Sequence, residues 1–261
     1  MIISQEQQMN NTKPYVISFC SGKRSVGKSV VAANISYLLA NSGIKILLLD
    51  TDIQFPTLHL IYGEEPMMRI NDILTGNSTI STAIHPIMQN LSLIAGSTGE
   101  LSKVNENQFR NCLQGIIAQN ECESIIFDCS FGVNDDVIEC IKLSDMVIIL
   151  ISDEPSSVID GYGVIKTIQS IMPYKEIRII INNVIDKEDA DETEQKLNRA
   201  TAHFLSSEIS SLGFVPYDRI VKSSIMRQEL LAHFYPNSDS TLELRKIANA
   251  ISEHIKTEVY V

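Results

Sequence analysis

One short segment combines glycine, lysine and serine residues at a spacing that suits phosphate chemistry. Gly22 and Gly27 enclose four residues and lead into Lys28 and Ser29. In such a loop the backbone N–H groups can wrap a triphosphate, the lysine can reach its β and γ phosphates, and the serine hydroxyl can coordinate Mg²⁺. The segment therefore predicts a phosphate-binding loop. Its predicted binding residues are Gly22, Lys23, Arg24, Ser25, Val26, Gly27, Lys28, Ser29 and Val30.

An apolar run precedes this loop and a helical pattern follows it. Residues 15–20 are short, apolar and β-prone, as expected of a buried parallel strand. Residues 29–41 carry apolar side chains at helical spacing, and Gly43 marks the end of that helix. A strand, a glycine-bounded loop and a helix together point a helix N-terminus at a phosphate. This context favours a nucleotide site over a chance match in a structural turn.

The rest of the chain alternates apolar strands with helical segments. Strands are predicted at 44–49, 91–95, 124–127, 146–151 and 176–181. Helices are predicted at 105–120, 135–142, 156–172, 189–212 and 240–256. The alternation predicts an α/β fold in which a mostly parallel twisted sheet is covered by helices on both faces. We assign residues 14–261 to one domain and expect residues 1–13 to form a flexible polar segment.

Polar side chains stand where three of these strands end. Asp50 and Asp52 follow one strand, Asp128 closes another, and Asn182 follows a third. Ligands of parallel sheets bind at the carboxyl ends of the strands. An apolar strand that ends in Asp beside a phosphate loop is the pattern that holds Mg²⁺ through a water molecule. A lone Asp after a strand is also a common start of a turn, but its occurrence together with the loop favours a nucleotide site.

Composition narrows the classes of function. The chain has 32 acidic and 21 basic residues and a net charge of −11, which counts against nonspecific DNA binding. It has no run of eighteen apolar residues, and its polar start does not resemble a secretory signal, so we expect a cytoplasmic protein. Its five cysteines include no C-x-x-C pair, which argues against a disulfide framework or a zinc site.

The loop and the strand ends together resemble the MinD/ParA family of P-loop ATPases, whose loop has the pattern K-G-G-x-G-K-[ST]. Lys23 stands five residues before Lys28, at the position of that family's signature lysine. Residues 48–52 resemble the family's D-x-D segment, and residues 128–130 resemble its Walker B region. The resemblance extends from residue 15 to about residue 255 and implies the P-loop NTPase fold of that family.

The resemblance also implies cofactors and residue roles. ATP or ADP with Mg²⁺ would bind, and ATP would be hydrolysed. Lys28 would contact the phosphates, Lys23 would reach across a dimer to the partner's phosphates, and Asp52 would orient the attacking water. The implied catalytic residues are thus Lys23, Lys28 and Asp52, and the implied metal residues are Ser29, Asp50 and Asp128. Residues resembling the family's adenine pocket are Asn182, Pro216, Tyr217 and Asp218.

Softer motifs resemble the FlhG-like branch of the family, which regulates flagellar number and placement. They lie at residues 60–66, 71–76 and 154–162. This finer resemblance implies a switch that forms an ATP-dependent homodimer and binds flagellar proteins, such as an FlhF-type GTPase, switch or C-ring proteins, or a transcriptional regulator. A polar or peripherally membrane-associated location would fit such a role.

The chain departs from the family pattern inside the loop. Arg24 and Ser25 replace the two glycines that follow the signature lysine. Arg24 could clash with a dimer partner, crowd the γ-phosphate or bind the phosphates as a cation, because a guanidinium binds them bidentately. An alternative function is therefore a catalytically impaired pseudo-ATPase scaffold. In the Walker B region Phe131 stands where the family prefers a small residue.

Further departures concern partners. Residues 5–9 do not match the stretch with which FlhG-like chains stimulate their partner GTPase. The last predicted helix has few basic residues, so we expect it to pack in the core rather than to bind a membrane surface, although membrane binding stays open. A third function, DNA partitioning of the ParA type, is disfavoured by the acidic charge.

Overall fold

The chain folds around one sheet in the computed structural model, which describes residues 13–53, 55–97, 106–119 and 121–259. The strands are β1 (Tyr15–Ser21), β2 (Ile46–Asp50), β3 (His85–Met88), β4 (Leu91–Ile94), β5 (Ser124–Phe131), β6 (Met146–Ile151), β7 (Glu176–Val184) and β8 (Ser211–Pro216). Of the segment expected to be flexible, only Lys13 belongs to the described residues. Its ammonium lies 3.5 Å from the carboxylate of Asp145.

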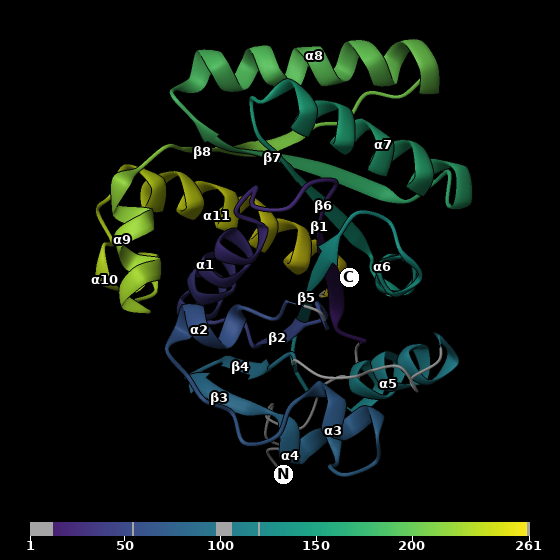
Figure 1. The fold of residues 1–261 in the computed structure, drawn as a ribbon, viewed down its shortest axis with the longest axis vertical. Coiled ribbons are helices and arrows are strands. Elements are labelled where there is room, and N and C mark those ends of the chain that lie inside the picture. Colours follow the sequence, from purple (N-terminus) through teal and green to yellow (C-terminus); the bar gives the residue numbers. More distant parts are fainter. Residues whose placement is uncertain (1–12, 54, 98–105, 120, 260–261) are drawn as a thin grey trace, which may run out of the picture.

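The strands follow the order β3-β4-β2-β5-β1-β6-β7-β8 (Figure 1). Neighbouring strands are parallel, except that β3 pairs with β4 in the antiparallel sense at one edge. Strands β1 and β6 at the centre are buried along their whole length and are mostly apolar, because helices cover both faces of the sheet. The predicted fold class, a mostly parallel α/β sheet between helices, is therefore confirmed.

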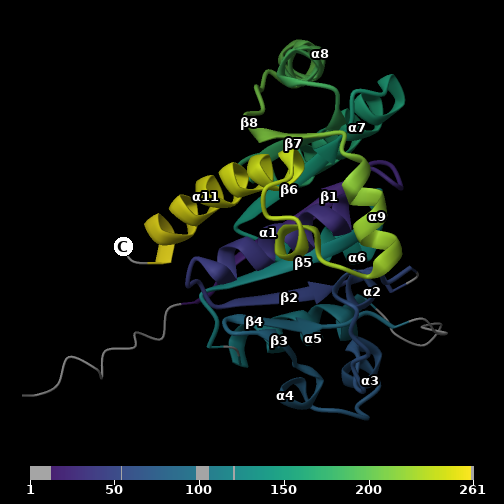
Figure 2. The same cartoon turned by 90° about the vertical axis from the view of Figure 1, so that its left-hand side faces the viewer.

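Within the described residues, helices connect consecutive strands, except between β3 and β4, and three more helices follow β8 (Figure 2). They are α1 (Lys28–Asn41), α2 (Leu58–Tyr62), α3 (Ile70–Leu74), α4 (Ile80–Ala83), α5 (Glu106–Gln119), α6 (Asp135–Leu143), α7 (Pro155–Ile171), α8 (Lys187–Leu205), α9 (Arg219–Arg227), α10 (Leu231–Phe234) and α11 (Asp239–Val259). Helix α1 begins directly after the phosphate loop, so that its N-terminus faces the loop.

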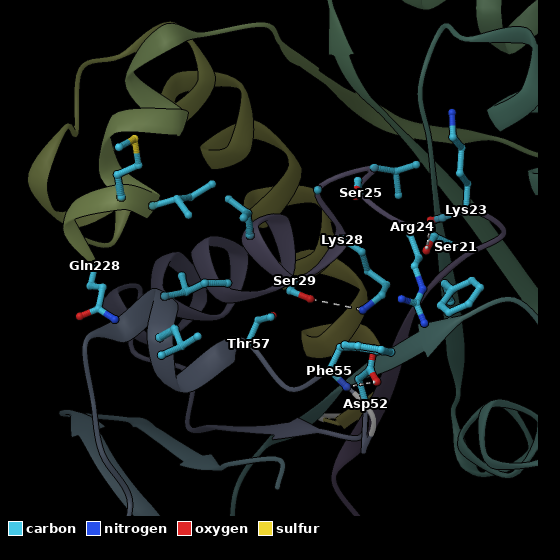
Figure 3. Close-up of a pocket in the computed structure, with 18 residues that line it drawn as sticks. Ser21, Lys23, Arg24, Ser25, Lys28, Ser29, Asp52, Phe55, Thr57 and Gln228 are labelled. Atoms are coloured by element: carbon cyan, nitrogen blue, oxygen red, sulfur yellow. Dashed lines mark hydrogen bonds between the residues drawn. The ribbon is translucent and has the colours of Figure 1, made fainter. Parts of the chain in front are cut away.

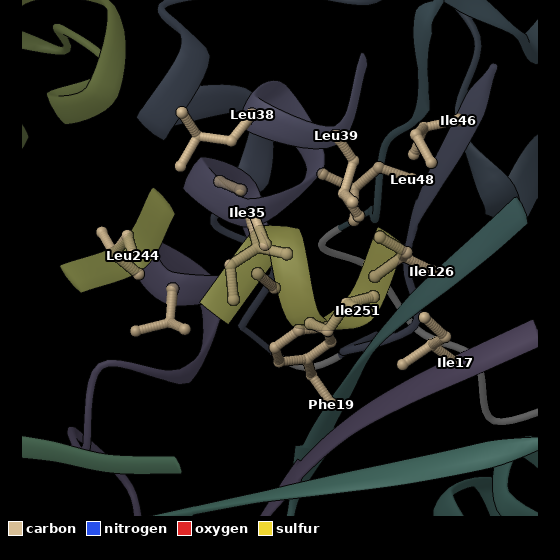
Figure 4. Packing of buried hydrophobic residues seen from close by; sticks show 14 of the residues in the cluster. Ile17, Phe19, Ile35, Leu38, Leu39, Ile46, Leu48, Ile126, Leu244 and Ile251 are labelled. Carbon is tan, nitrogen blue, oxygen red and sulfur yellow. The ribbon is translucent and has the colours of Figure 1, made fainter. Parts of the chain in front are cut away.

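One face of the sheet packs against α1 and α11. Phe19 of β1 and Ile126 of β5 meet Leu39 of α1 and Ile251 of α11 in a shared apolar cluster (Figure 4). Ile251 is fully buried, as are the other apolar positions along this side of α11. The prediction that the last helix packs in the core is therefore confirmed.

The opposite face packs against α5, α6, α7 and α8. Neighbouring residues of β1 divide between the faces: Val16 joins this second cluster, whereas Ile17 joins the first. The division follows from the alternation of side chains along a strand. The two clusters pack on opposite faces of the sheet, and the site residues lie at the ends of its strands.

The structure corrects one helix boundary. The helix predicted at 189–212 is α8, which ends at Leu205, and the residues from Ser211 onward form the edge strand β8. Ser206 adopts a left-handed backbone conformation with φ of 51° and closes the helix. The short elements α2, α3, α4, β3, α9 and α10 were not predicted, because each is four to nine residues long and carries little periodic signal.

All five cysteines are free thiols, and Cys20, Cys129 and Cys140 are buried. Cys112 and Cys122 are partly buried. Within the described residues, none of the helices has both the length and the apolar character needed to cross a membrane.

Candidate nucleotide-binding site

The segment between β1 and α1 forms a loop at the carboxyl end of the sheet, and a cavity of about 590 Å³ opens over it (Figure 3). All of the predicted loop residues except Gly22 line this cavity. The carboxyl end of a parallel sheet is where such proteins bind ligands. The loop therefore stands in the place expected of a phosphate-binding loop.

Two glycines allow this loop to pack closely. Gly27 has φ of 84°, and a Cβ there would lie 2.3 Å from the amide nitrogen of Asn182. The same amide donates a hydrogen bond of 2.7 Å to the carbonyl oxygen of Val26. A Cβ on Gly22 would lie 2.5 Å from the backbone of Asp160 in α7. Both positions thus require glycine, and the loop is supported by β7 and α7.

Lys28 and Asp128 form an ion pair beneath the loop. The Lys28 ammonium bonds to Oδ1 of Asp128 and lies 3.4 Å from the Ser29 hydroxyl. The Lys28 side chain is 8% exposed and that of Asp128 is 1% exposed. Burial alone would lower the pKa of Lys28, but the charge of Asp128 and the hydrogen bond to it raise that pKa above its ordinary value. Lys28 is therefore charged at neutral pH.

Asp50 anchors the loop that follows β2. Its Oδ1 accepts the N–H of Asp52 at 3.1 Å, and its Oδ2 accepts the N–H groups of Thr57 at 3.0 Å and Leu58 at 3.1 Å. Burial and the charge of Asp128 raise the pKa of Asp50 to about 8, while the bonds from Thr57 and Leu58 oppose this rise. Asp50 thus ties the residues after β2 to the end of that strand, and its implied role in binding the metal stays a prediction.

The oxygen donors beneath the loop fit Mg²⁺. Asp50 and Asp128 lie opposite each other in the register of β2 and β5. Oδ2 of Asp128 is buried without a hydrogen-bond partner among the described residues, so that one carboxylate oxygen is left for a ligand. Magnesium uses one or two carboxylates together with phosphate oxygens and waters. The described residues contain no group of three or more His, Cys, Asp or Glu side chains that could hold a metal ion.

Asp52 also lines the cavity over the phosphate loop. Its Oδ1 accepts the N–H of Phe55 at 2.9 Å. The structure thus brings together Lys28, Ser29, Asp50, Asp52 and Asp128, which come from α1, from the end of β2 and from β5. Such a group can neutralise phosphate charge and position a water, as phosphoryl transfer requires.

Lys23 is turned away from this group. Its ammonium pairs with the carboxylate of Glu154 and bonds to the Ser156 hydroxyl at 3.1 Å, at the start of α7. Figure 3 shows the side chains of Lys23 and Lys28 pointing in different directions from the loop. The predicted reach of Lys23 to a partner's phosphates stays a prediction, and it requires Lys23 to leave Glu154.

The residues predicted for the base line a neighbouring cavity of about 490 Å³. Asn182 at the end of β7 contributes to it together with the turn of Pro216, Tyr217 and Asp218 after β8. Asp218 caps α9, accepting the N–H of Ile220 at 2.8 Å. The two cavities share lining residues, among them Gly27 and Val30, so they adjoin along the phosphate loop.

Arg24 has an environment that the sequence did not reveal. Its guanidinium carbon lies 4.1 Å from the ring centroid of Phe55 and 4.2 Å from that of Phe131. Phe55 was not a predicted site residue, and Phe131 was noted only as a departure from a family pattern.

Ile225 and Met226 of α9 also line the cavity and were missed. The helix-capping signal of Asp218 could have revealed α9.

Comparisons with known proteins agree with this geometry. The family model described as the CobQ/CobB/MinD/ParA nucleotide binding domain matches residues 17–231. The antiactivator FleN of Pseudomonas aeruginosa is 23% identical over 251 residues, covering 94% of this chain and 89% of FleN. The flagellum site-determining protein YlxH of Helicobacter pylori is 26% identical over 253 residues, covering 95% of this chain and 84% of YlxH.

A solved structure supports the fold independently. The septum site-determining protein MinD of Pyrococcus horikoshii, complexed with Mg-ADP, superposes with a TM-score of 0.79 at 19% sequence identity. The match covers 95% of this chain and 100% of that MinD chain. The predicted resemblance to the MinD/ParA family, including its FlhG-like members, is thus confirmed. The chain belongs to the CobQ/CobB/MinD/ParA nucleotide-binding family and has the fold of its MinD/ParA ATPases.

Proposed function

We propose that the chain is a Mg²⁺-dependent ATPase that acts as a molecular switch. The observation that carries the proposal is the grouping of the Lys28 ammonium and the Ser29 hydroxyl, which line one cavity, with the buried Asp128 carboxylate, which pairs with Lys28. Lys28 contacts the phosphates of ATP, while Ser29 and Asp128 serve the metal with help from Asp50. Bound Mg²⁺ would neutralise charge on the phosphates during transfer to water.

Asp52 is the residue that we propose to orient the attacking water. It lies after β2 and lines the same cavity as Lys28 and Ser29. The products are ADP, inorganic phosphate and a proton. The base lies in the neighbouring cavity beside Asn182 and Tyr217. The MinD of P. horikoshii is complexed with Mg-ADP, which supports an adenine nucleotide and Mg²⁺ as the cofactors.

The process that we propose for this switch is the control of flagellar number or placement. The support comes from two relatives that match along most of this chain: one is named an antiactivator and the other a flagellum site-determining protein. ATP would favour a homodimer, and the dimer would bind flagellar proteins in the cytoplasm or at a cell pole. Hydrolysis would return the protein to its monomeric form.

Phosphate release at saturating Mg-ATP tests the enzymatic part of this proposal. We expect slow turnover by the unmodified chain, none after Mg²⁺ is chelated, and none in Lys28→Ala or Asp52→Ala. The matched control is Lys196→Ala, which removes an exposed lysine of α8 and leaves turnover unchanged. Turnover no higher than that of Lys28→Ala, in a chain that still binds ATP, would overturn ATP hydrolysis.

That outcome would favour the second candidate, a pseudo-ATPase scaffold. Two observations support keeping it: Lys23 is paired within its own chain, and the Arg24 side chain stands at the cavity between two aromatic rings. A scaffold would bind ATP and partner proteins without turnover. Nucleotide binding measured beside phosphate release therefore separates the two candidates.

A further inference from the structure

The phosphate loop carries three cationic side chains, and two of them have acidic partners. Lys23 is paired with Glu154, and Lys28 is paired with Asp128. Within the part of the chain that the structure describes, the Arg24 guanidinium has neither a carboxylate partner nor a hydrogen-bond acceptor. Arg24 nevertheless lines the cavity with Lys28 and Ser29. Its positive charge is thus available to an anion in that cavity.

Two aromatic rings hold this guanidinium. The Phe55 and Phe131 centroids lie 4.1 Å and 4.2 Å from its central carbon, and Figure 3 shows Arg24 reaching toward Phe55. Contacts of this kind use the flat faces of a guanidinium. Its N–H donors lie in its plane and stay accessible, in a fork that matches the oxygens of a phosphate. The rings therefore orient a cation whose donors have no acceptor in the described protein.

The strand order indicates which part of a nucleotide Arg24 would meet. Phe55 follows β2 and Phe131 ends β5, and both strands lie on one side of β1. The residues proposed for the base, Asn182 and the turn at 216–218, lie at the carboxyl ends of β7 and β8 on the other side of β1. The phosphate loop follows β1, between these two groups. A nucleotide with its base beside Asn182 therefore points its terminal phosphate toward Arg24.

We propose that Arg24 binds the terminal phosphate of ATP within its own chain, and that Phe55 and Phe131 are positioning residues that orient its guanidinium. The inference rests on the proposed function, because it takes the cavity to be an ATP site. The family pattern has glycine at this position, so the cation belongs to this chain rather than to the family. It gives a single copy of the protein a preference for a triphosphate over a diphosphate.

Calorimetric titration with Mg-AMPPNP and with Mg-ADP tests the role of Arg24. A lost hydrogen bond between charged groups weakens AMPPNP binding roughly tenfold to a hundredfold in Arg24→Ala. ADP binding should change by less than about threefold, because ADP lacks the terminal phosphate. The matched control is Arg199→Ala, which removes an exposed arginine of α8 and should leave both affinities unchanged. Arg24 is itself exposed, so its replacement leaves the core intact.

The positioning role of the Phe55 and Phe131 rings is tested by variants that keep or remove the aromatic ring. Phe131→Leu should lose part of the preference for AMPPNP over ADP, and Phe131→Tyr should restore it, since tyrosine also stacks on a guanidinium. A structural role alone would lower the melting temperature and weaken both nucleotides together. Phe55→Leu and Phe55→Tyr form the matching pair on the other ring.

Three results would overturn the inference. These are an equal loss of ADP and AMPPNP affinity in Arg24→Ala, no loss of AMPPNP affinity, or a loss found only at concentrations where the molar mass doubles. The last result would mean that Arg24 acts on a second copy. Failure of the proposed function looks different, because the unmodified chain would then bind neither nucleotide or would bind without turnover. A chain that binds without turnover can still confirm the role of Arg24.

Discussion

At the scale of single residues, the phosphate loop keeps the backbone of a glycine-rich loop while replacing two glycines. Ser25 has φ of 63°, a left-handed conformation that residues with a Cβ rarely adopt. The neighbouring replacement, Arg24, places a cation at the cavity. The motif could be predicted from the sequence because its glycines, lysine and serine all lie in one short segment, residues 22–29. The environment of Arg24 could not be predicted, because its two aromatic neighbours, Phe55 and Phe131, lie far from it in the chain.

Replacing Ser25 with glycine should stabilise the protein. The Ser25 side chain is exposed, so its removal loses little contact and relieves the left-handed strain. The expected gain is about 1 kcal/mol in the free energy of unfolding, after allowance for the greater freedom of glycine in the unfolded chain. Urea unfolding measures it, with Ser25→Ala as the control that should show no gain. A loss of stability in Ser25→Gly would contradict this account of the backbone.

The buried pair of Lys28 and Asp128 predicts an asymmetric response to substitution. Asp128→Ala leaves the Lys28 ammonium buried without its partner, which should cost about 3–5 kcal/mol of unfolding free energy. The double variant Lys28→Met with Asp128→Leu removes both charges and should be the more stable of the two. Denaturant unfolding of both variants checks this order. The reverse order would mean that the pair is not desolvated.

At the scale of elements, a second ion-paired group joins α5 to α6 on the side of the sheet away from the phosphate loop's helix. Glu139 of α6 accepts two bonds from the Arg110 guanidinium of α5, one of them 2.9 Å long. It also accepts a bond of 2.6 Å from Lys142. The bonds from Arg110 have the largest effect on the pKa of Glu139 and lower it, burial comes second and raises it, and the bond from Lys142 helps to bring the pKa to about 2.

This depressed pKa predicts loss of stability in acid. The contribution of ionised Glu139 is fully present above its unfolded pKa of 4.5 and is lost as the pH falls through the folded pKa of about 2. Because Arg110 and Lys142 are partly exposed, solvent screening limits the contribution of ionised Glu139 to about 1–2 kcal/mol of unfolding free energy. Urea unfolding at pH 6 and pH 3.5 should show a smaller acid loss in Glu139→Gln than in the unmodified chain. Equal losses would contradict the assignment.

Element types were predictable where apolar patterns were long. The strands β1, β2, β4, β5, β6 and β7 and the helices α1, α5, α6, α7 and α11 were all expected near their observed positions. The end of α8 was missed, because no glycine marks it and Ser206 supplies the left-handed cap instead. The strand β8 was missed with it, since its polar start and its glycine hide the apolar pattern.

At the scale of the whole molecule, the strand order collects the site. Placing β1 between β5 and β6 brings the phosphate loop beside Asp128 and, one strand further, beside Asp50. The grouping of these residues could be predicted from their positions at strand ends. The orientation of Lys23 could not, because it depends on Glu154 at the start of α7, which is 131 residues further along the chain.

Breaking the ion pair between Lys23 and Glu154 should promote dimer formation if Lys23 reaches the phosphates bound to a second copy. Glu154→Gln removes the carboxylate that pairs with it and should lower the protein concentration at which Mg-AMPPNP produces dimers. Sedimentation velocity over a dilution series measures that concentration. The matched control is Asp153→Asn, which removes the neighbouring negative charge and leaves the pair of Lys23 and Glu154 in place. An equal effect of both variants would assign the change to net charge rather than to Lys23.

The molar mass of the chain with each nucleotide shows whether ATP drives a switch between one chain and two. Light scattering is measured on Asp52→Ala, in which hydrolysis should be blocked, with Mg-ATP and with Mg-ADP over a range of protein concentrations. A nucleotide shifts this equilibrium only through its different affinities for the two forms. We predict the mass of two chains with Mg-ATP and of one chain with Mg-ADP. The mass of a single chain with both nucleotides at every concentration would contradict the account.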